Sequence, residues 1–392
     1  MKWASSMSLA TDSYEAISAC LASLKQDLMG ADPHLVLVFA SLHHRQAFPH
    51  LGKEIATGLN AQQVLGCTGG GIVGDGQEVE HRAALSVCAA VLPGVQVQSF
   101  HFEDADLPEE IEPEALLQYL DVPAESRFIL LPDPFSTRSE QLLRLMDLAF
   151  PGTAKIGGLA SGGRMAGMHA LFVDDRVHTQ GTVGLALSGN LRMETVVAQG
   201  CRPIGQPMFI TSCQDNLLMR LNDRSPREVL RELYQTLDEN DQALFRHSLF
   251  LGLEMKLKED AYTQGDFLIR NILSLDPASG AMRIGTQLFE TAVAQFHLRD
   301  ADTSREDLDL RLRDAVTRNG EPAWSGALMF SCLGRGKELY GIPNHDSDAI
   351  RHHLGELPVA GFFCNGEIGP VQGQTYLHGY TSSIGLFRPA DA

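Results

Sequence analysis

The sequence lacks any long run of apolar residues. Its strongest stretch, residues 83–97, is broken by Pro93 and Gly94, and a membrane-spanning helix needs roughly 18 uninterrupted apolar residues. Residues 1–6 also lack the apolar core of a secretory signal. We therefore expect a cytoplasmic protein that does not bind membranes, and whose ligands are already inside the cell.

Basic residues are scarce as well. The chain has 31 Lys and Arg against 49 Asp and Glu, which gives a formal net charge of −18 at pH 7. A surface this acidic repels phosphate groups, so we expect neither nucleic acid nor anionic lipid as a partner.

Metal and disulfide motifs are missing too. The seven cysteines are an odd number, widely scattered, with no Cys-x-x-Cys pair, which excludes a disulfide framework and a zinc-ribbon site. The adjacent pairs His43-His44 and His352-His353 project in different directions on a helix or strand. We expect no metal site.

Two glycine-rich segments superficially resemble nucleotide-binding loops. Residues 69–74 match G-x-G-x-x-G, but the acidic residues 75–80 that follow read as a turn, and their carboxylates would repel a pyrophosphate. Residues 334–337 precede Glu338, where a phosphate loop needs Ser or Thr. We therefore expect no cofactor.

The chain contains a repeated pattern. An apolar strand, an amphipathic helix, a second strand ending in a glycine-rich turn and a further strand recur three times. The repeats begin at residues 35–40, 128–131 and 327–332. This order predicts a mixed α/β fold with repeated β-α-β-β units, in which helices flank mixed sheets.

The length of 392 residues predicts two domains. The Pro/Gly-rich residues 200–207 are expected to be the junction between the two domains. The predicted division is a leader helix at residues 1–30, an N-terminal domain at 31–204 and a C-terminal domain at 205–392. Two capping boxes are also predicted, one from Thr137 and Glu140 and one from Ser225 and Glu228.

Two charged residues stand at glycine-rich strand ends. Arg335 lies between two glycines just beyond a buried strand, where a guanidinium is placed to clamp a carboxylate through two hydrogen bonds; a surface arginine in a turn fits the spacing equally. Glu367 lies in the third glycine-rich turn, where it is expected either to receive a ligand's amine or to cap backbone N–H groups.

The alternative hypothesis is an enzyme with a nucleophilic Cys or Ser side chain. Cys67, Ser161, Cys332 and Cys364 all end strands, as nucleophiles often do. However, the chain has no G-x-S-x-G elbow and no cysteine-protease signature. Strand-end cysteines are more often packing residues.

The C-terminal motifs strongly resemble the FIST C-terminal domain. They are the strand at residues 327–332, Gly334-Arg335-Gly336, and the stretches 357–370 and 377–381. Residues 66–68 and 200–205 are similar to the companion FIST N-terminal domain. The resemblance spans residues 30 to 388.

The resemblance implies an intracellular sensory protein that binds a small ligand, with amino acids as the proposed class, and that transmits the signal to an unnamed partner. One position departs from the family pattern: the N-terminal turn has Gly71-Ile72, where the family has a glutamate between glycine and isoleucine. We expect no catalytic residues. The candidate ligand-binding residues are Cys67, Thr68, Gly69, Arg335, Cys364, Asn365, Gly366, Glu367 and Thr381.

In the expected mechanism, glycine-rich strand ends of the two domains face a shared cleft. There Arg335 meets a carboxylate of the ligand, Glu367 or Asn365 meets its amine, and binding shifts the domains. A hydrolase or transferase that uses Cys67 or Cys364, and a pure interaction scaffold, are the alternatives.

Overall fold

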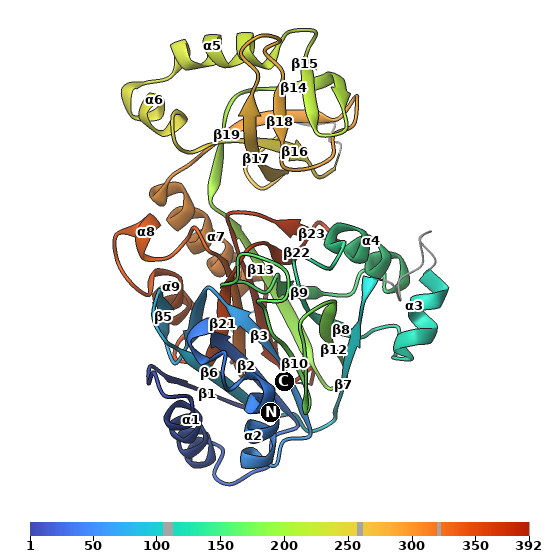
Figure 1. Ribbon diagram of the computed structural model, residues 1–392, viewed down its shortest axis with the longest axis vertical. Helices are drawn as coiled ribbons and strands as arrows, with labels where there is room; N and C mark the ends of the chain where they lie inside the picture. The colour runs from blue at the N-terminus through green and yellow to red at the C-terminus, as the bar shows by residue number, and fades with distance from the viewer. Residues whose placement is uncertain (105–112, 257–261, 320–322, 392) are drawn as a thin grey trace. The chain divides into compact units, whose positions relative to one another are not determined.

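The computed structural model describes residues 1–104, 113–256, 262–319 and 323–391 (Figure 1). The chain has the expected mixed α/β fold and forms two compact units. Unit 1 comprises Met1–Val197, Leu308–Leu377 and Thr381–Ala392, and unit 2 comprises Ala198–Asp307 and His378–Tyr380. Each unit combines separate segments of the chain, whereas the prediction, with a boundary between residues 204 and 205, gave each domain one continuous segment.

Unit 1 is built on three six-stranded sheets. In spatial order, the first holds β1 (Lys2–Ser8), β6 (Leu85–Val91), β2 (Leu35–Ser41), β3 (Gln63–Gly69), β10 (Leu171–Val173) and β11 (Arg176–His178). The second holds β7 (Val95–Phe102), β12 (Thr182–Gly189), β8 (Arg127–Pro132), β9 (Lys155–Gly158), β22 (Glu367–Val371) and β23 (Gln374–His378). The third holds β13 (Arg192–Gln199), β24 (Thr381–Arg388), β20 (Gly326–Cys332), β21 (Val359–Cys364), β4 (Gly71–Gly74) and β5 (Gln77–Glu80).

The three sheets share one plan, which follows the three sequence repeats. Each has a central parallel pair, β2–β3, β8–β9 or β20–β21. An α-helix lies between the strands of each pair, because a parallel connection needs a crossover. The last strand of each repeat, β6, β12 or β24, returns to pair antiparallel with the first.

The repeats exchange hairpins in a closed cycle. The β4–β5 hairpin of the first repeat pairs with β21 of the third, and β10–β11 of the second pairs with β3 of the first. The β22–β23 hairpin of the third repeat pairs with β9 of the second. Each sheet is therefore completed by another repeat.

A glycine occupies the same position in the second parallel strand of every repeat. The three are Gly66, Gly157 and Gly361, which face Val38, Leu130 and Met329 in the register of the parallel pairs. A Cβ atom built on each glycine would lie 1.8–1.9 Å from the carbonyl oxygen of the facing residue. No side chain fits there, which explains why glycine recurs at this point of all three repeats.

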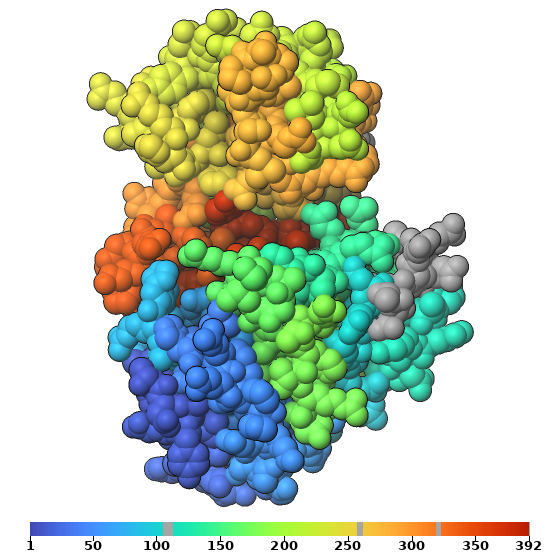
Figure 2. Space-filling view, in the orientation of Figure 1, coloured from blue at the N-terminus to red at the C-terminus, as the bar shows by residue number. Residues whose placement is uncertain are grey.

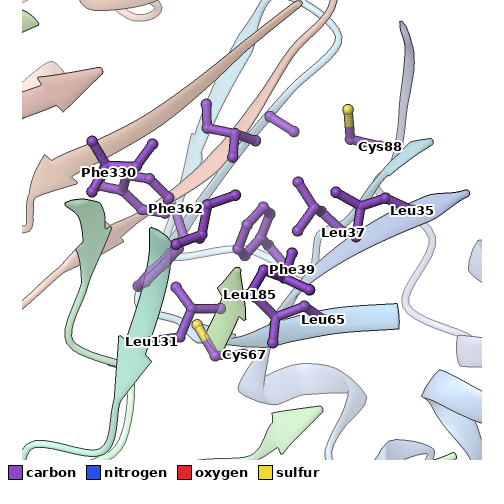
Figure 3. Packing of buried hydrophobic residues seen from close by; sticks show 14 of the residues in the cluster. Leu35, Leu37, Phe39, Leu65, Cys67, Cys88, Leu131, Leu185, Phe330 and Phe362 are labelled. Carbon is purple, nitrogen blue, oxygen red and sulfur yellow. The ribbon is translucent and has the colours of Figure 1, made fainter. Parts of the chain in front are cut away.

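Both faces of the central strands are buried, as their continuous apolar runs predict. In β2, Leu35, Leu37 and Phe39 enter a core shared by the three sheets, while the intervening residues pack toward α1 (Ser13–Asp27) and α2 (Phe48–Leu59). Figure 3 shows this shared core, in which Phe39 and Phe362 stack with ring centroids 5.3 Å apart.

The other helices of the described residues are short to medium in length. They are α3 (Pro113–Leu120), α4 (Ser139–Ala149), α5 (Pro226–Thr236), α6 (Glu239–Phe245), α7 (Ala301–Asn319), α8 (Lys337–Tyr340) and α9 (His345–Leu354), with a 3-10 turn η1 (Leu42–His44). The Ser225–Glu228 capping box at α5 is confirmed. The predicted Thr137 cap is wrong, because α4 begins after Arg138 and the Thr137 hydroxyl donates to Gly181 O instead.

Unit 2 is a closed six-stranded barrel accompanied by α5 and α6 (Figure 1). Its strands, in order around the barrel, are β14 (Cys201–Gln214), β15 (Leu217–Leu221), β18 (Met282–Ile284), β17 (Phe267–Leu275), β16 (Leu249–Glu254) and β19 (Val293–Arg299). The domain junction expected at residues 200–207 lies next to the boundary between the two units, at Val197 and Ala198, and residues 201–207 form the first half of strand β14. A register shift between Ile204 and Met208 and a positive φ at Gly205 accommodate the Pro/Gly-rich sequence within the strand.

Candidate functional site

The glycine-rich ends of β3, β9 and β21 meet inside unit 1, and Ser161 joins all three. Its hydroxyl accepts a hydrogen bond from Gly70 N at 2.8 Å and donates one to Phe363 O, while its own N–H donates to Thr68 O at 3.0 Å. One residue of the second repeat thus fixes the turns of the first and third. Ligands of α/β proteins often bind at such carboxyl ends of strands.

Glu367 is the buried acidic residue at this meeting point. It begins β22 opposite Gly158, and no part of it is exposed. The equivalent positions of the other two hairpins, Leu171 and Ile72, are apolar. Of the three equivalent hairpin positions, one therefore has a carboxyl group and the other two have apolar side chains.

The surroundings of Glu367 favour its protonated form. Burial raises its pKa to about 8, against the opposing effects of a hydrogen bond from Thr381 N to Oε2 (3.1 Å), one from the Cys364 thiol to Oε1 (3.4 Å), and the charge of Arg335. Glu367 therefore holds a proton at neutral pH. The Glu367 carboxyl group also accepts backbone N–H groups, from Thr381 of β24 and from Glu367 itself, which is the kind of bond that the capping interpretation expects.

Arg335 is fully buried and already holds a carboxylate of its own chain. Its Nε donates to Asp346 Oδ2 at 2.9 Å and its Nη2 to Asp346 Oδ1 at 3.1 Å, and the guanidinium carbon lies 5.5 Å from the centroid of the Tyr340 ring. Burial opposes both charges, yet the pair lowers the pKa of Asp346 and raises that of Arg335. Nη1 has no partner among the described residues.

Asp346 is supported by further donors. The Ser331 hydroxyl lies 3.3 Å from its Oδ2 and His345 Nδ1 lies 2.9 Å from its Oδ1. His345 in turn stacks on Tyr340 with ring centroids 3.5 Å apart. The guanidinium predicted to clamp a ligand is thus part of a fixed buried network, which sequence spacing did not reveal.

Glu78 is a second buried carboxyl group within the electrostatic reach of Arg335. Its Oε1 accepts from Ser347 N at 2.7 Å, and its N–H donates to Asn344 Oδ1 at 2.8 Å. Burial, and then the charge of Asp346, raise its pKa to about 8. Of residues 75–80, expected to form an acidic turn, Asp75 and Gly76 do form the β4–β5 turn, whereas Gln77–Glu80 form strand β5. Hairpin exchange brings the buried Glu78 to the first turn of α9.

The remaining predicted site residues fall into three groups. Gly366 lies in the turn between Cys364 and Glu367, near Thr381, and its carbonyl accepts a hydrogen bond from Leu159 N at 2.9 Å. Asn365 of the same turn is exposed. Thr68 is linked to this group through Ser161, which also bonds Gly70, the residue after Gly69. Cys67 is not linked to it, because its side chain packs in the shared core near Leu131 (Figure 3).

The geometry gives no support to Cys67 or Cys364 as a nucleophile. Both thiols are fully buried, and burial raises both pKa values well above the usual thiol value. The Cys364 Sγ also lies 3.4 Å from Ser331 O, which is a second acceptor within reach of its single proton. A thiolate, the reactive form, is therefore disfavoured at both positions.

A buried Asp–His pair near the second strand end escaped the sequence analysis. His169 Nδ1 lies 2.7 Å from Asp133 Oδ1, and His169 Nε2 accepts from Gly163 N at 3.1 Å. The Ser136 hydroxyl donates to Asp133 Oδ2 at 2.6 Å. Although burial opposes it, these bonds lower the pKa of Asp133. The pair anchors the loop after β9.

Two features are absent from the residues that the structure describes. None of their helices is long and apolar enough to cross a bilayer. Within the same residues, no group of three or more His, Cys, Asp and Glu side chains is arranged to hold a metal ion.

Comparison with known proteins covers nearly the whole chain. A model of the FIST N domain matches residues 34–224, and a model of the FIST C domain matches residues 227–370. An uncharacterized protein of Mycobacterium tuberculosis is 36% identical over 383 residues, which cover 97% of this chain and 98% of that protein. Another from Mycobacterium bovis is 35% identical over 377 residues, or 96% of each. An alignment with the crystal structure of cyanuric acid hydrolase from A. caulinodans covers 99% of both chains, with 9% sequence identity and a TM-score of 0.38.

Proposed function

Because the chain belongs to the FIST family, whose domains are associated with sensory signal transduction, we propose that it is a sensory protein that binds a small amine-bearing metabolite, an amino acid among the candidates. The binding site we assign is the turn Cys364–Glu367 together with Thr381. The single observation that carries the proposal is Glu367, a fully buried carboxyl group with a pKa of about 8 where three strand ends meet. Buried ionisable groups with shifted pKa values concentrate at functional sites.

The chemistry of Glu367 fits an ammonium ligand. Without a ligand, burial favours the protonated carboxyl group, and its two oxygens accept hydrogen bonds from Thr381 N and the Cys364 thiol. An ammonium group brought next to it favours the ionised form, so binding releases a proton. Asn365, which is exposed, and Gly366, which lacks a side chain, form the part of the turn that yields to the ligand.

The role of Arg335 changes accordingly. With Nε and Nη2 bonded to Asp346, Arg335 does not form a two-pronged clamp on the ligand. Its positive charge also limits how far the pKa of Glu367 rises. The pKa of Glu367 is therefore close enough to neutral pH for a bound ligand to change the protonation of this carboxyl group.

The test is a thermal-shift screen of the full chain against amino acids and other small amines. A ligand at about 100 times its dissociation constant stabilises the protein by about 2.7 kcal/mol, or roughly 5–10 °C at this domain size. We expect a selective rise in the wild type that disappears in Glu367→Gln.

The matched control is Glu78→Gln. Glu78 is also buried, also has a pKa of about 8 and also senses Arg335, but it contacts α9 rather than the strand ends. The rise should persist in this variant. A flat response across the panel, or an equal response in Glu367→Gln, would contradict the proposal.

A further inference from the structure

An open groove lies on the surface of the unit 2 barrel, and its volume is about 590 Å³. Its walls come from the second half of β14, the turn after β15 and the turn before β19. Figure 2 shows yellow-green segments of β14 and β15 beside orange segments that include β18 on the visible face of unit 2. Three segments that are separate in sequence thus form one surface feature.

Two phenylalanines at this groove expose more than half of their surface. Phe209 lies on β14 and is 54% exposed, and Phe289 opens the turn before β19 and is 59% exposed. The turn is held against β14, because Thr291 N donates to Ile210 O and Ile210 N donates to Ala292 O, both at 2.9 Å. Neighbouring exposed aromatic side chains indicate an interaction surface.

Thr291 supplies an observation independent of these aromatic side chains. Ala292 N donates to Phe289 O at 3.4 Å, so Thr291 is the third residue of a four-residue turn, and its φ is 73°. A positive φ at the third position is characteristic of type II turns, which place glycine or asparagine there. A β-branched residue in this conformation is strained, and such strain concentrates at functional sites. The turn that presents Phe289 is therefore held in a costly conformation.

The charged side chains that line the groove are acidic. They are Asp223 and Glu290, and neither carboxylate has a hydrogen-bond or ion-pair partner among the described residues. A basic neighbour, Arg220, donates from Nη1 to the carbonyl oxygen of Asp223 at 2.7 Å. A second copy of the chain would be repelled, because its net charge is −18. A partner that carries Lys or Arg is attracted, and the two carboxylates offer it charge-assisted hydrogen bonds.

We propose that this groove docks a segment of another protein that presents a large apolar side chain next to Lys or Arg. The apolar side chain packs against Phe209 and Phe289, and the basic groups meet Asp223 and Glu290. The strained turn at Thr291 is part of the contact. The inference goes beyond the proposed function, which leaves the partner of the sensor unassigned, and it does not depend on the ligand of Glu367.

A library of random 12-residue peptides displayed on phage provides the test. The library is selected on the full-length protein and depleted on the double variant Phe209→Ser with Phe289→Ser. The enriched peptides should combine Lys or Arg with aromatic or large aliphatic residues. A synthetic, fluorescently labelled copy of the most enriched peptide then gives dissociation constants by fluorescence polarisation.

Substitutions at the groove should weaken the binding of this peptide. The double phenylalanine variant should raise the dissociation constant at least about tenfold, and Asp223→Asn with Glu290→Gln at least about threefold. The matched control is Leu148→Ser, which removes a 57% exposed apolar side chain from α4 of unit 1 and should bind as the wild type does. Glu367→Gln, measured without added metabolite, should also bind the peptide normally, which separates this proposal from the amine site.

Thr291→Gly tests the strained turn by two measurements. Glycine adopts the positive φ without strain, so thermal unfolding followed by circular dichroism should shift to a higher temperature. The same variant should bind the peptide at least about threefold more weakly, because it lacks the side chain that the turn presents. Improved stability combined with weaker binding is the result expected of strain that serves an interaction.

Four outcomes would overturn the inference. One is a selection in which no peptide family prefers the wild type to the double phenylalanine variant. Another is a set of enriched peptides without basic residues. The third is an affinity that survives the substitution of Asp223 and Glu290. The fourth is a Thr291→Gly protein that binds the peptide as tightly as the wild type.

Discussion

Glu78 and Ser347 are 269 positions apart in the chain, yet Ser347 N donates to Glu78 Oε1 at 2.7 Å. The bond joins the hairpin of the first repeat to the helix of the third. The reciprocal bond from Glu78 N to Asn344 Oδ1 fixes the same contact from the other side. Hairpin exchange therefore connects the buried charges of repeats that are distant in sequence.

Replacing Arg335 with methionine should destabilise unit 1 by about 3–5 kcal/mol, because Asp346 is left buried without its counter-charge. Urea unfolding followed by tryptophan fluorescence measures this, since Trp3 and Trp324 both lie in unit 1. Arg351→Met, which removes a half-exposed arginine, should cost less than about 1 kcal/mol. Equal losses in the two variants would contradict the assignment.

The stability of unit 1 should fall as pH rises from about 4.5 to about 8. Burial raises the pKa values of Glu78 and Glu367 in the folded state to about 8, so the folded state binds more protons than the unfolded state in that interval. Each group contributes a slope of up to about 1.4 kcal/mol per pH unit. The stabilisation from protonated Glu78 and Glu367 is fully present below about pH 4.5 and lost above about pH 8.

The two glutamine variants isolate these contributions. Glu367→Gln and Glu78→Gln should each flatten the pH dependence of the free energy of unfolding by about one proton. Urea unfolding at a series of pH values between 5 and 8 provides the comparison. A variant with the same slope as the wild type would show that its glutamate is ionised in the folded state.

Gly66→Ala should destabilise unit 1 by about 3 kcal/mol or more, because the new Cβ would lie 1.9 Å from Val38 O. Gly58→Ala is the matched control: there the new Cβ meets only the side chain of Leu21, and alanine favours the helix. Urea unfolding of both variants measures the difference. A Gly66→Ala protein as stable as Gly58→Ala would mean that β2 and β3 separate more easily than the register suggests.

Ser161→Ala should cost about 2 kcal/mol, because it leaves Gly70 N and Phe363 O without their buried partner. Ser126→Ala should be close to neutral, since the buried Ser126 hydroxyl has no partner among the described residues. Amide hydrogen exchange should show faster exchange at Gly70 in the first variant only. Unchanged protection of Gly70 would exclude Ser161 as the joining residue.

Thiol labelling of the folded protein should distinguish the cysteines. Cys213 and Cys332 are partly exposed, whereas Cys67 and Cys364 are fully buried. Burial raises the pKa of Cys213 as well as those of Cys67 and Cys364, so exposure is what distinguishes the two pairs. An aromatic disulfide reagent should therefore modify the first two quickly, and the others only on unfolding. Rapid, selective modification of Cys67 or Cys364 would restore the enzyme alternative.

The repeats and their fold class could be predicted because they depend on local patterns. Apolar runs such as residues 35–40 indicate strands buried on both faces, and recurring glycines mark the strand ends. The position of Glu367 at a glycine-rich turn was also visible in the sequence. These features are set by near neighbours in the chain.

The electrostatic network could not be predicted, because it depends on contacts between repeats. Nothing near Glu78 in sequence indicates that Arg335 and Asp346 lie close to it. Likewise, the spacing around Arg335 cannot show that Asp346 occupies two of its donor nitrogens. Long-range pairing, and not local propensity, decides which charges are buried together.

Hairpin exchange also sets the order in which the chain can be completed on the ribosome. Strand β9 ends at Gly158, and its partner β22 begins only at Glu367. At about 5–20 residues per second, roughly 10–40 s of synthesis separate the two. For that time the nascent chain carries an unpaired strand edge beside a finished parallel pair, and the ring of repeats closes only after β22 has been synthesised.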